Sequence, residues 1–177
     1  PYTLFVVDGV RIAVIGMVTA AIPYWLHESL WQGMQFQSIA SCLQRWVNHV
    51  RSNEQADFVV GLFHSGYTGG IADTRYPENE VKVVAQQTMG IDIILFGHDH
   101  QQKQEVVGHA DGSSTLLLNP SSNAHLMAEL TLNLQITSEE VQKIDCKGEL
   151  VSLEKQPIGD VFMQHFAADK QQVEDYT

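Results

Sequence analysis

Two short apolar segments constrain the fold of this chain more than any other feature. Residues 58–63 form the first run, broken only by Gly61, and residues 91–96, apolar except for Asp92, form the second. A short continuous apolar run is typical of a strand buried on both faces of a sheet. Between the runs lie a polar, glycine-rich loop and a helical pattern over residues 78–89. The order strand, loop, helix, strand predicts a βαβ unit with parallel strands and a right-handed crossover.

The segments before this unit predict a hairpin and a helix. Asp8-Gly9 separates two β-rich runs, Tyr2–Val7 and Arg11–Val18, which indicates an antiparallel hairpin. Over Ser38–Arg51 apolar residues recur at spacings of three and four, which predicts a helix with one apolar stripe. The looser stretch 19–36 between them is interpreted as a long loop whose tryptophans, Trp25 and Trp31, are packing residues.

After His100 the helical periodicity disappears. Strand-like runs over residues 105–107, 115–118 and 126–136 predict an antiparallel meander. A helical pattern returns over Asp160–Tyr176. We therefore expect an α/β fold, with residues 1–157 in one domain and residues 158–177 as a connecting or terminal helix.

Composition limits the classes of partner. The chain has 177 residues, of which 44% are hydrophobic, and this indicates a folded domain with a core. Its formal net charge of −11 disfavours sequence-independent binding to a nucleic acid polymer. No apolar stretch approaches the roughly 18 residues that a membrane span needs. The chain opens at Pro1 without Met and runs straight into a strand-like segment, so we expect it to be cut from something longer.

Three histidines occupy the positions of greatest chemical interest. His64 directly follows the first buried run, and His98 follows the second after Gly97. Ligands gather at the carboxyl ends of parallel strands, so these two side chains are expected to lie close together. In an extended segment His98 and His100 would leave the same side, about 6–7 Å apart, which suits two metal ions about 3.5–4 Å apart. Asp99 would point elsewhere and could orient a ring.

The simpler interpretation is that each histidine is only a polar residue at a strand end. This explains a single histidine well, but it explains less well why histidines follow both strands of one βαβ unit. The remaining histidines show no comparable placement and are interpreted as surface or packing residues: His27, His49, His109, His125 and His165.

A family resemblance is carried by three segments, residues 61–66 (GLFHSG), 78–81 (ENEV) and 90–100 (GIDIILFGHDH). They resemble the later motifs of the calcineurin-like metallophosphoesterases, and most closely the 5′-nucleotidase and 2′,3′-cyclic-nucleotide 2′-phosphodiesterase branch. The opening hairpin and residues 16–19 (GMVT) also match that branch. The resemblance covers about Tyr2 to Ile136. It implies part of a β-sandwich flanked by helices, namely the carboxy-terminal half of the catalytic domain.

The resemblance also implies a site and an activity. His64 and His98 would bind one divalent metal ion and His100 a second, the metal being Zn, Mn, Fe or Co. The reaction would be hydrolysis of a nucleotide or another small phosphate ester, a step of nucleotide catabolism. The branch is mostly exported, which implies the periplasm or the cell surface.

The family's other ligands lie in earlier motifs that this chain lacks. Neither an Asp-x-His nor a Gly-Asn-His occurs in its 177 residues. The bridging aspartate and the histidine that assists the leaving group are therefore missing, so no catalytic residue is assigned and the substrate-binding residues stay unknown. We expect a fragment that is inactive alone, without the amino-terminal half and a carboxy-terminal substrate domain.

Two other functions remain open on the sequence. The chain could be a non-catalytic metal-binding module that holds one ion through His64, His98 and His100. It could also be a metal-free structural domain with polar strand ends. One tight zinc ion per chain would favour the module.

Overall fold

The computed structural model describes residues 1–137, 141–157 and 159–176. Six strands form one mixed sheet in the order β1-β2-β3-β4-β6-β5, and β7 and β8 form a separate two-stranded sheet. The strands are β1 (Tyr2–Val7), β2 (Val10–Val18), β3 (Phe58–His64), β4 (Ile93–Gly97), β5 (Gln102–Gly108), β6 (Ser114–Pro120), β7 (Leu126–Ile136) and β8 (Val141–Ser152). The helices are α1 (Ile22–Trp25), the 3₁₀ turn η1 (Glu28–Leu30), α2 (Ile39–Ser52), α3 (Val81–Gln87), α4 (Asp160–His165) and α5 (Ala167–Tyr176).

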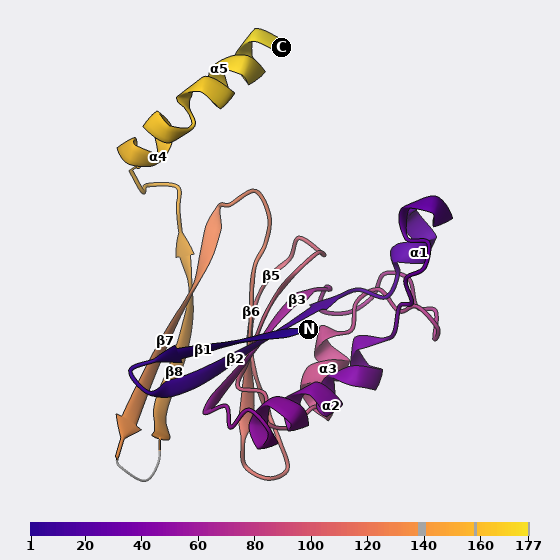
Figure 1. Ribbon diagram of the computed structural model, residues 1–177, viewed down its shortest axis with the longest axis vertical. Helices are drawn as coiled ribbons and strands as arrows, with labels where there is room; N and C mark the ends of the chain where they lie inside the picture. The colour runs from indigo at the N-terminus through magenta and orange to yellow at the C-terminus, as the bar shows by residue number, and fades with distance from the viewer. Residues whose placement is uncertain (138–140, 158, 177) are drawn as a thin grey trace.

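The large sheet separates two layers of apolar packing. Helices α2 and α3 cover one face, and the β7–β8 hairpin lies against the other (Figure 1). The predicted apolar stripe of α2 is buried. Four of its residues are at most 1% exposed, namely Ile39, Leu43, Val47 and Val50. On the opposite face Phe58 and Leu118 pack against the hairpin. The predicted α/β class, with a sheet flanked by helices, is confirmed.

The β1–β2 hairpin forms as the sequence predicts. Asp8 and Gly9 have φ angles of 51° and 85°, so both central residues of the turn are in the left-handed region. A two-residue turn of this kind matches the right-handed twist of the flanking strands, which explains the Asp-Gly pair.

The predicted βαβ unit is also present and fixes the strand ends. Strands β2, β3 and β4 are parallel neighbours. In this register His64 lies beside Val18 on one side and beside Gly97 on the other. The carboxyl ends of three strands therefore meet at one edge of the sheet.

The chain after His100 combines two arrangements. Strand β6 pairs antiparallel with β5, as the meander predicts, but it also joins the sheet as a parallel neighbour of β4. Strand β7 pairs antiparallel with β8 in the separate sheet, so the predicted meander does not continue from β6 to β7. The sequence pattern did not predict β8. Gly148 lies within β8, and a Cβ there would lie 2.5 Å from Leu118 Cδ1. The hairpin backbone therefore approaches the sheet closely at this glycine.

The carboxy-terminal helix predicted over Asp160–Tyr176 divides into α4 and α5 at Phe166, whose φ of −100° and ψ of 13° are not helical. Its apolar side chains are not buried, since Val161 is 82% exposed and Phe162 63% exposed. Both helices extend away from the sheet (Figure 1). Within the described residues, no helix has the length and apolar character to cross a membrane.

Candidate metal centre

The ends of β3 and β4 bring two of the predicted ligands together. His64 Nε2 lies 3.2 Å from His98 Nδ1, and the two rings meet edge to face with centroids 4.9 Å apart. The parallel register produces this contact, because His64 pairs with Gly97 and His98 is the next residue.

The separation of these nitrogens is compatible with a shared metal ion. Zinc binds imidazole nitrogen at about 2.0–2.1 Å in tetrahedral geometry, which places two ligand atoms about 3.3–3.4 Å apart. The 3.2 Å separation of His64 Nε2 and His98 Nδ1 therefore suits either one hydrogen bond or two ligands of one cation. The two nitrogen atoms are therefore spaced as two ligands of one metal ion would be.

The His98 ring is held from two further sides. Its Nε2 lies 2.9 Å from Glu78 Oε1, and the Trp25 ring lies 5.2 Å away, centroid to centroid. The backbone of His98 has a φ of 98°, which a residue with a Cβ rarely adopts. Strain of this kind persists where surrounding contacts fix the residue, and it is frequent at functional sites. Trp25, interpreted from sequence as a packing residue, is 43% exposed and lies against His98.

His100 does not join a three-residue cluster. Across residues 1–137, 141–157 and 159–176, no group of three or more His, Cys, Asp and Glu side chains is arranged to hold a metal ion. The expectation of an extended segment is wrong, since His98 and His100 have positive φ angles of 98° and 56°. Strand alternation therefore does not place these two side chains on one side. The carbonyl of His100 accepts a hydrogen bond from Ser121 Oγ at 2.8 Å.

Asp99 shapes the loop instead of orienting an imidazole. Its carboxylate accepts hydrogen bonds from the backbone N–H of Tyr67 at 2.7 Å and from Asn119 Nδ2 at 2.8 Å. Asn119 is fully buried at the end of β6. Asp99 thus ties the segment that carries His98 to β6 and to the loop after β3.

Residues 78–80 were expected to open a helix, but α3 begins at Val81. The carboxylate of Glu78 contacts His98 and accepts the backbone N–H of Ile71 at 2.7 Å. Asn79 Oδ1 accepts the backbone N–H of Gly66 at 2.8 Å. Glu80 accepts the N–H of Ile39 at 2.9 Å. Sequence reasoning missed Glu78, although residues 78–81 were part of the motif that carries the family resemblance.

Next to Trp25, an aromatic residue of α1 contacts one from the loop after β3. The rings of Tyr24 and Tyr76 meet edge to face with centroids 6.0 Å apart. A hydrogen bond from the Tyr24 hydroxyl lowers the pKa of Asp73 below its ordinary value, and the same bond raises the pKa of Tyr24. These contacts join α1 to the loop after β3.

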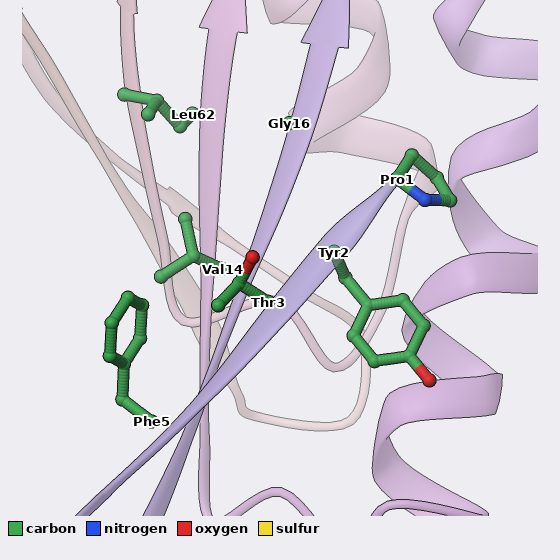
Figure 2. A pocket seen from close by; sticks show the side chains of 7 residues that line it. All are labelled: Pro1, Tyr2, Thr3, Phe5, Val14, Gly16 and Leu62. Carbon is green, nitrogen blue, oxygen red and sulfur yellow. The ribbon is translucent and has the colours of Figure 1, made fainter.

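A separate hollow on the sheet has a different chemical character. It is lined by side chains of β1–β3 including Phe5, Val14 and Leu62, and Figure 2 shows them around an open space. None of its lining residues is a histidine or a carboxylate. This hollow therefore offers no imidazole or carboxylate ligand for a metal ion.

Comparison with known proteins places this geometry in a family context. No protein-family model matches the chain. The trifunctional nucleotide phosphoesterase protein YfkN of Bacillus subtilis (strain 168) is 26% identical over 155 residues, which are 81% of this chain and 10% of that protein. The match therefore spans about a tenth of the length of this curated relative.

Solved structures with the same fold include two phosphoesterases. The calcineurin-like phosphoesterase YfkN from Bacillus subtilis superposes with a TM-score of 0.77 at 23% identity, over 99% of this chain and 58% of that one. The 5′-nucleotidase precursor from Thermus thermophilus gives a TM-score of 0.74 at 19% identity, over 99% of this chain and 34% of that one. The predicted resemblance is confirmed: this chain has the fold of the calcineurin-like phosphoesterases and is similar to nucleotide phosphoesterases and 5′-nucleotidases.

Proposed function

We propose that this chain supplies part of the metal centre of a metal-dependent phosphoester hydrolase. The observation that carries the proposal is the 3.2 Å contact between His64 Nε2 and His98 Nδ1 at two neighbouring strand ends. Similarity to a nucleotide phosphoesterase supports the reaction class. In this proposal His64 and His98 bind one cation and His100 a second.

The chemistry would come from the cations and the positioning from the protein. When bound, two divalent ions polarise the phosphoryl group and activate the attacking water. Imidazole ligands suit Zn, Mn, Fe or Co. His64 and His98 would hold their ion, and Glu78 would contact the Nε2 atom of His98. The hydrogen bonds of Asp99 would keep the segment that carries His98 in place.

The ligand set within these 177 residues is incomplete. Asp-x-His and Gly-Asn-His are absent, and neutral histidines provide no charge to balance two dications. We therefore propose that residues 1–157 are the carboxy-terminal half of the catalytic domain, that residues 158–177 connect or end it, and that the chain alone hydrolyses little. The proposed substrate is a nucleotide or another small phosphate ester, and the proposed location is the periplasm or cell surface.

Metal binding by the chain itself tests the site. We expect His98→Ala to weaken Mn²⁺ or Zn²⁺ binding at least 10-fold in isothermal titration calorimetry, since one of two nitrogen donors is lost. His165→Ala is the matched control, because His165 lies exposed on α4, and it should leave the affinity unchanged. Equal affinities in both variants would remove the histidine pair from the site.

Activity tests the incomplete ligand set. Hydrolysis of bis(p-nitrophenyl) phosphate by the 177-residue chain with Mn²⁺ should stay near background. A rate close to that of an intact homologue would contradict this expectation. The coding sequence upstream of Pro1 provides a second test. Asp-x-His and Gly-Asn-His motifs found there would supply the other ligands and support the hydrolase.

The non-catalytic metal-binding module remains the second candidate, supported by the same histidine pair. One zinc ion per chain, bound tightly through three nitrogen atoms, would favour it over the hydrolase. Weak binding, strengthened when the missing carboxylate ligands are supplied, would favour the hydrolase.

A further inference from the structure

The Glu78 carboxylate is placed to control which nitrogen of His98 carries a proton. Its Oε1 lies 2.9 Å from His98 Nε2, and both side chains are only 18% exposed. A neutral imidazole has one N–H donor and one acceptor nitrogen, whereas an ionised carboxylate can only accept. The Glu78 contact therefore requires the N–H of His98 to be on Nε2. The lone pair of Nδ1 is left facing His64.

The Glu78 side chain is fixed independently of the histidine. Its Oε2 accepts the backbone N–H of Ile71 at 2.7 Å. Its carbonyl oxygen accepts hydrogen bonds from Thr19 Oγ1 at 2.8 Å and from Ser65 Oγ at 2.9 Å, and both donors belong to fully buried residues. The position of Glu78 is thus fixed by contacts that do not involve His98.

The backbone around Gly70 closes over the same carboxylate. Gly70 has a φ of 72°, which residues with a Cβ rarely adopt, and a Cβ there would overlap Glu78 Oε2. On the other side of the histidine, the Trp25 ring lies against His98. The carboxylate and the indole therefore contact the His98 ring from two sides.

We propose that Glu78 is a positioning residue that fixes the Nε2–H tautomer of His98 and presents Nδ1 to a cation shared with His64. The inference rests on the proposed function for the identity of that cation. Without metal, His64 Nε2 must then donate its proton to His98 Nδ1 across the 3.2 Å contact. With metal, His98 keeps its tautomer, while the His64 proton transfers through solvent from Nε2 to Nδ1, with no net proton released.

Long-range ¹H–¹⁵N correlation spectra of the imidazole rings test this in the unmodified chain. We expect Nε2–H on His98 both without and with Zn²⁺. For His64 we expect Nε2–H without Zn²⁺ and Nδ1–H with it. A metal-free chain in which His98 carries its proton on Nδ1 would overturn the proposal without any variant being made.

A pair of isosteric variants separates positioning from a general structural or charge effect. In Glu78→Gln the amide oxygen can still accept the Ile71 N–H, and the NH₂ group then donates to His98 Nε2 and selects the wrong tautomer. We expect His98 to switch to Nδ1–H and the Zn²⁺ affinity to fall about 10–100-fold. Asp111→Asn is the control, because Asp111 also accepts a backbone N–H, that of Ser113 at 2.9 Å, in the exposed turn between β5 and β6. It removes the same charge and should change neither the tautomer nor the affinity.

The outcomes distinguish this inference from the proposed function. If His98 switches tautomer in Glu78→Gln but the unmodified chain binds no Zn²⁺, the role of Glu78 is supported and the metal site is refuted. If the unmodified chain binds Zn²⁺ and Glu78→Gln changes neither the tautomer nor the affinity, the role of Glu78 is refuted and the metal site is supported.

Discussion

Glu80→Ala is expected to lower the free energy of unfolding by about 3 kcal/mol, because it removes the cap of a helix 40 residues away in sequence. Ser38, the residue before α2, makes no side-chain capping bond to the helix. The carboxylate of Glu80 instead accepts hydrogen bonds from the hydroxyl of Ser38 and from the N–H groups of Ile39 and Ala40. A negative charge at a helix amino terminus is favourable, and here it is 95% buried.

Chemical denaturation of a graded series measures this effect. Glu80→Gln keeps one acceptor oxygen and should lose about half as much as Glu80→Ala, since the charge-assisted bonds become neutral ones. Glu154→Ala changes an exposed acid and should stay within about 0.5 kcal/mol of the parent. A loss below about 1 kcal/mol in Glu80→Ala would show that α2 does not depend on this cap.

Gly66→Ala is expected to disturb both stability and the histidine pair. A Cβ at this buried position would lie 2.6 Å from Asn79 Oδ1 and 2.6 Å from Asp99 Cβ. Relief of these contacts must shift Asp99, whose carboxylate holds the loop that carries His98. We expect a loss of about 1–3 kcal/mol in unfolding free energy, typical of an overpacked interior. The Zn²⁺ affinity should fall roughly 10-fold because His98 is displaced.

Gly97→Ala is the matched control for this substitution. Gly97 directly precedes His98, yet a Cβ there meets no atom within 4 Å, and its φ is not positive. Stability should therefore change by less than about 0.5 kcal/mol. Similar losses in the Gly66 and Gly97 variants would mean that the close contact with Asp99 is not what makes glycine necessary at position 66.

The sequence was sufficient to predict the part of the site that follows from strand order. Short apolar runs before His64 and His98, joined by one helix, indicate parallel neighbours, and the ends of parallel neighbours meet. The 3.2 Å contact between the two rings follows from that arrangement. The hairpin turn at Asp8-Gly9 was predictable for a similar reason, since its conformation depends on two adjacent residues.

The parts that escaped prediction depend on contacts between distant segments. Periodicity extended the helix to residue 78, whereas Glu78, Asn79 and Glu80 bond to His98, Gly66 and Ile39 instead of continuing α3. Alternation was assumed from His98 to His100, but β4 ends at Gly97 and Asp99 bonds to Tyr67 and Asn119 across the site. Local pattern carries no information on such bonds, so neither the turn at His98 nor the role of Glu78 could be derived from it.

Anomalous diffraction from crystals soaked in Zn²⁺, recorded at the zinc absorption edge, tests the histidine pair most directly. The account predicts a peak about 2.0–2.1 Å from both His64 Nε2 and His98 Nδ1, with Glu78 still bonded to His98 Nε2. Zinc peaks elsewhere on the molecule and none between these two nitrogens, with the rings still in contact with each other, would contradict it.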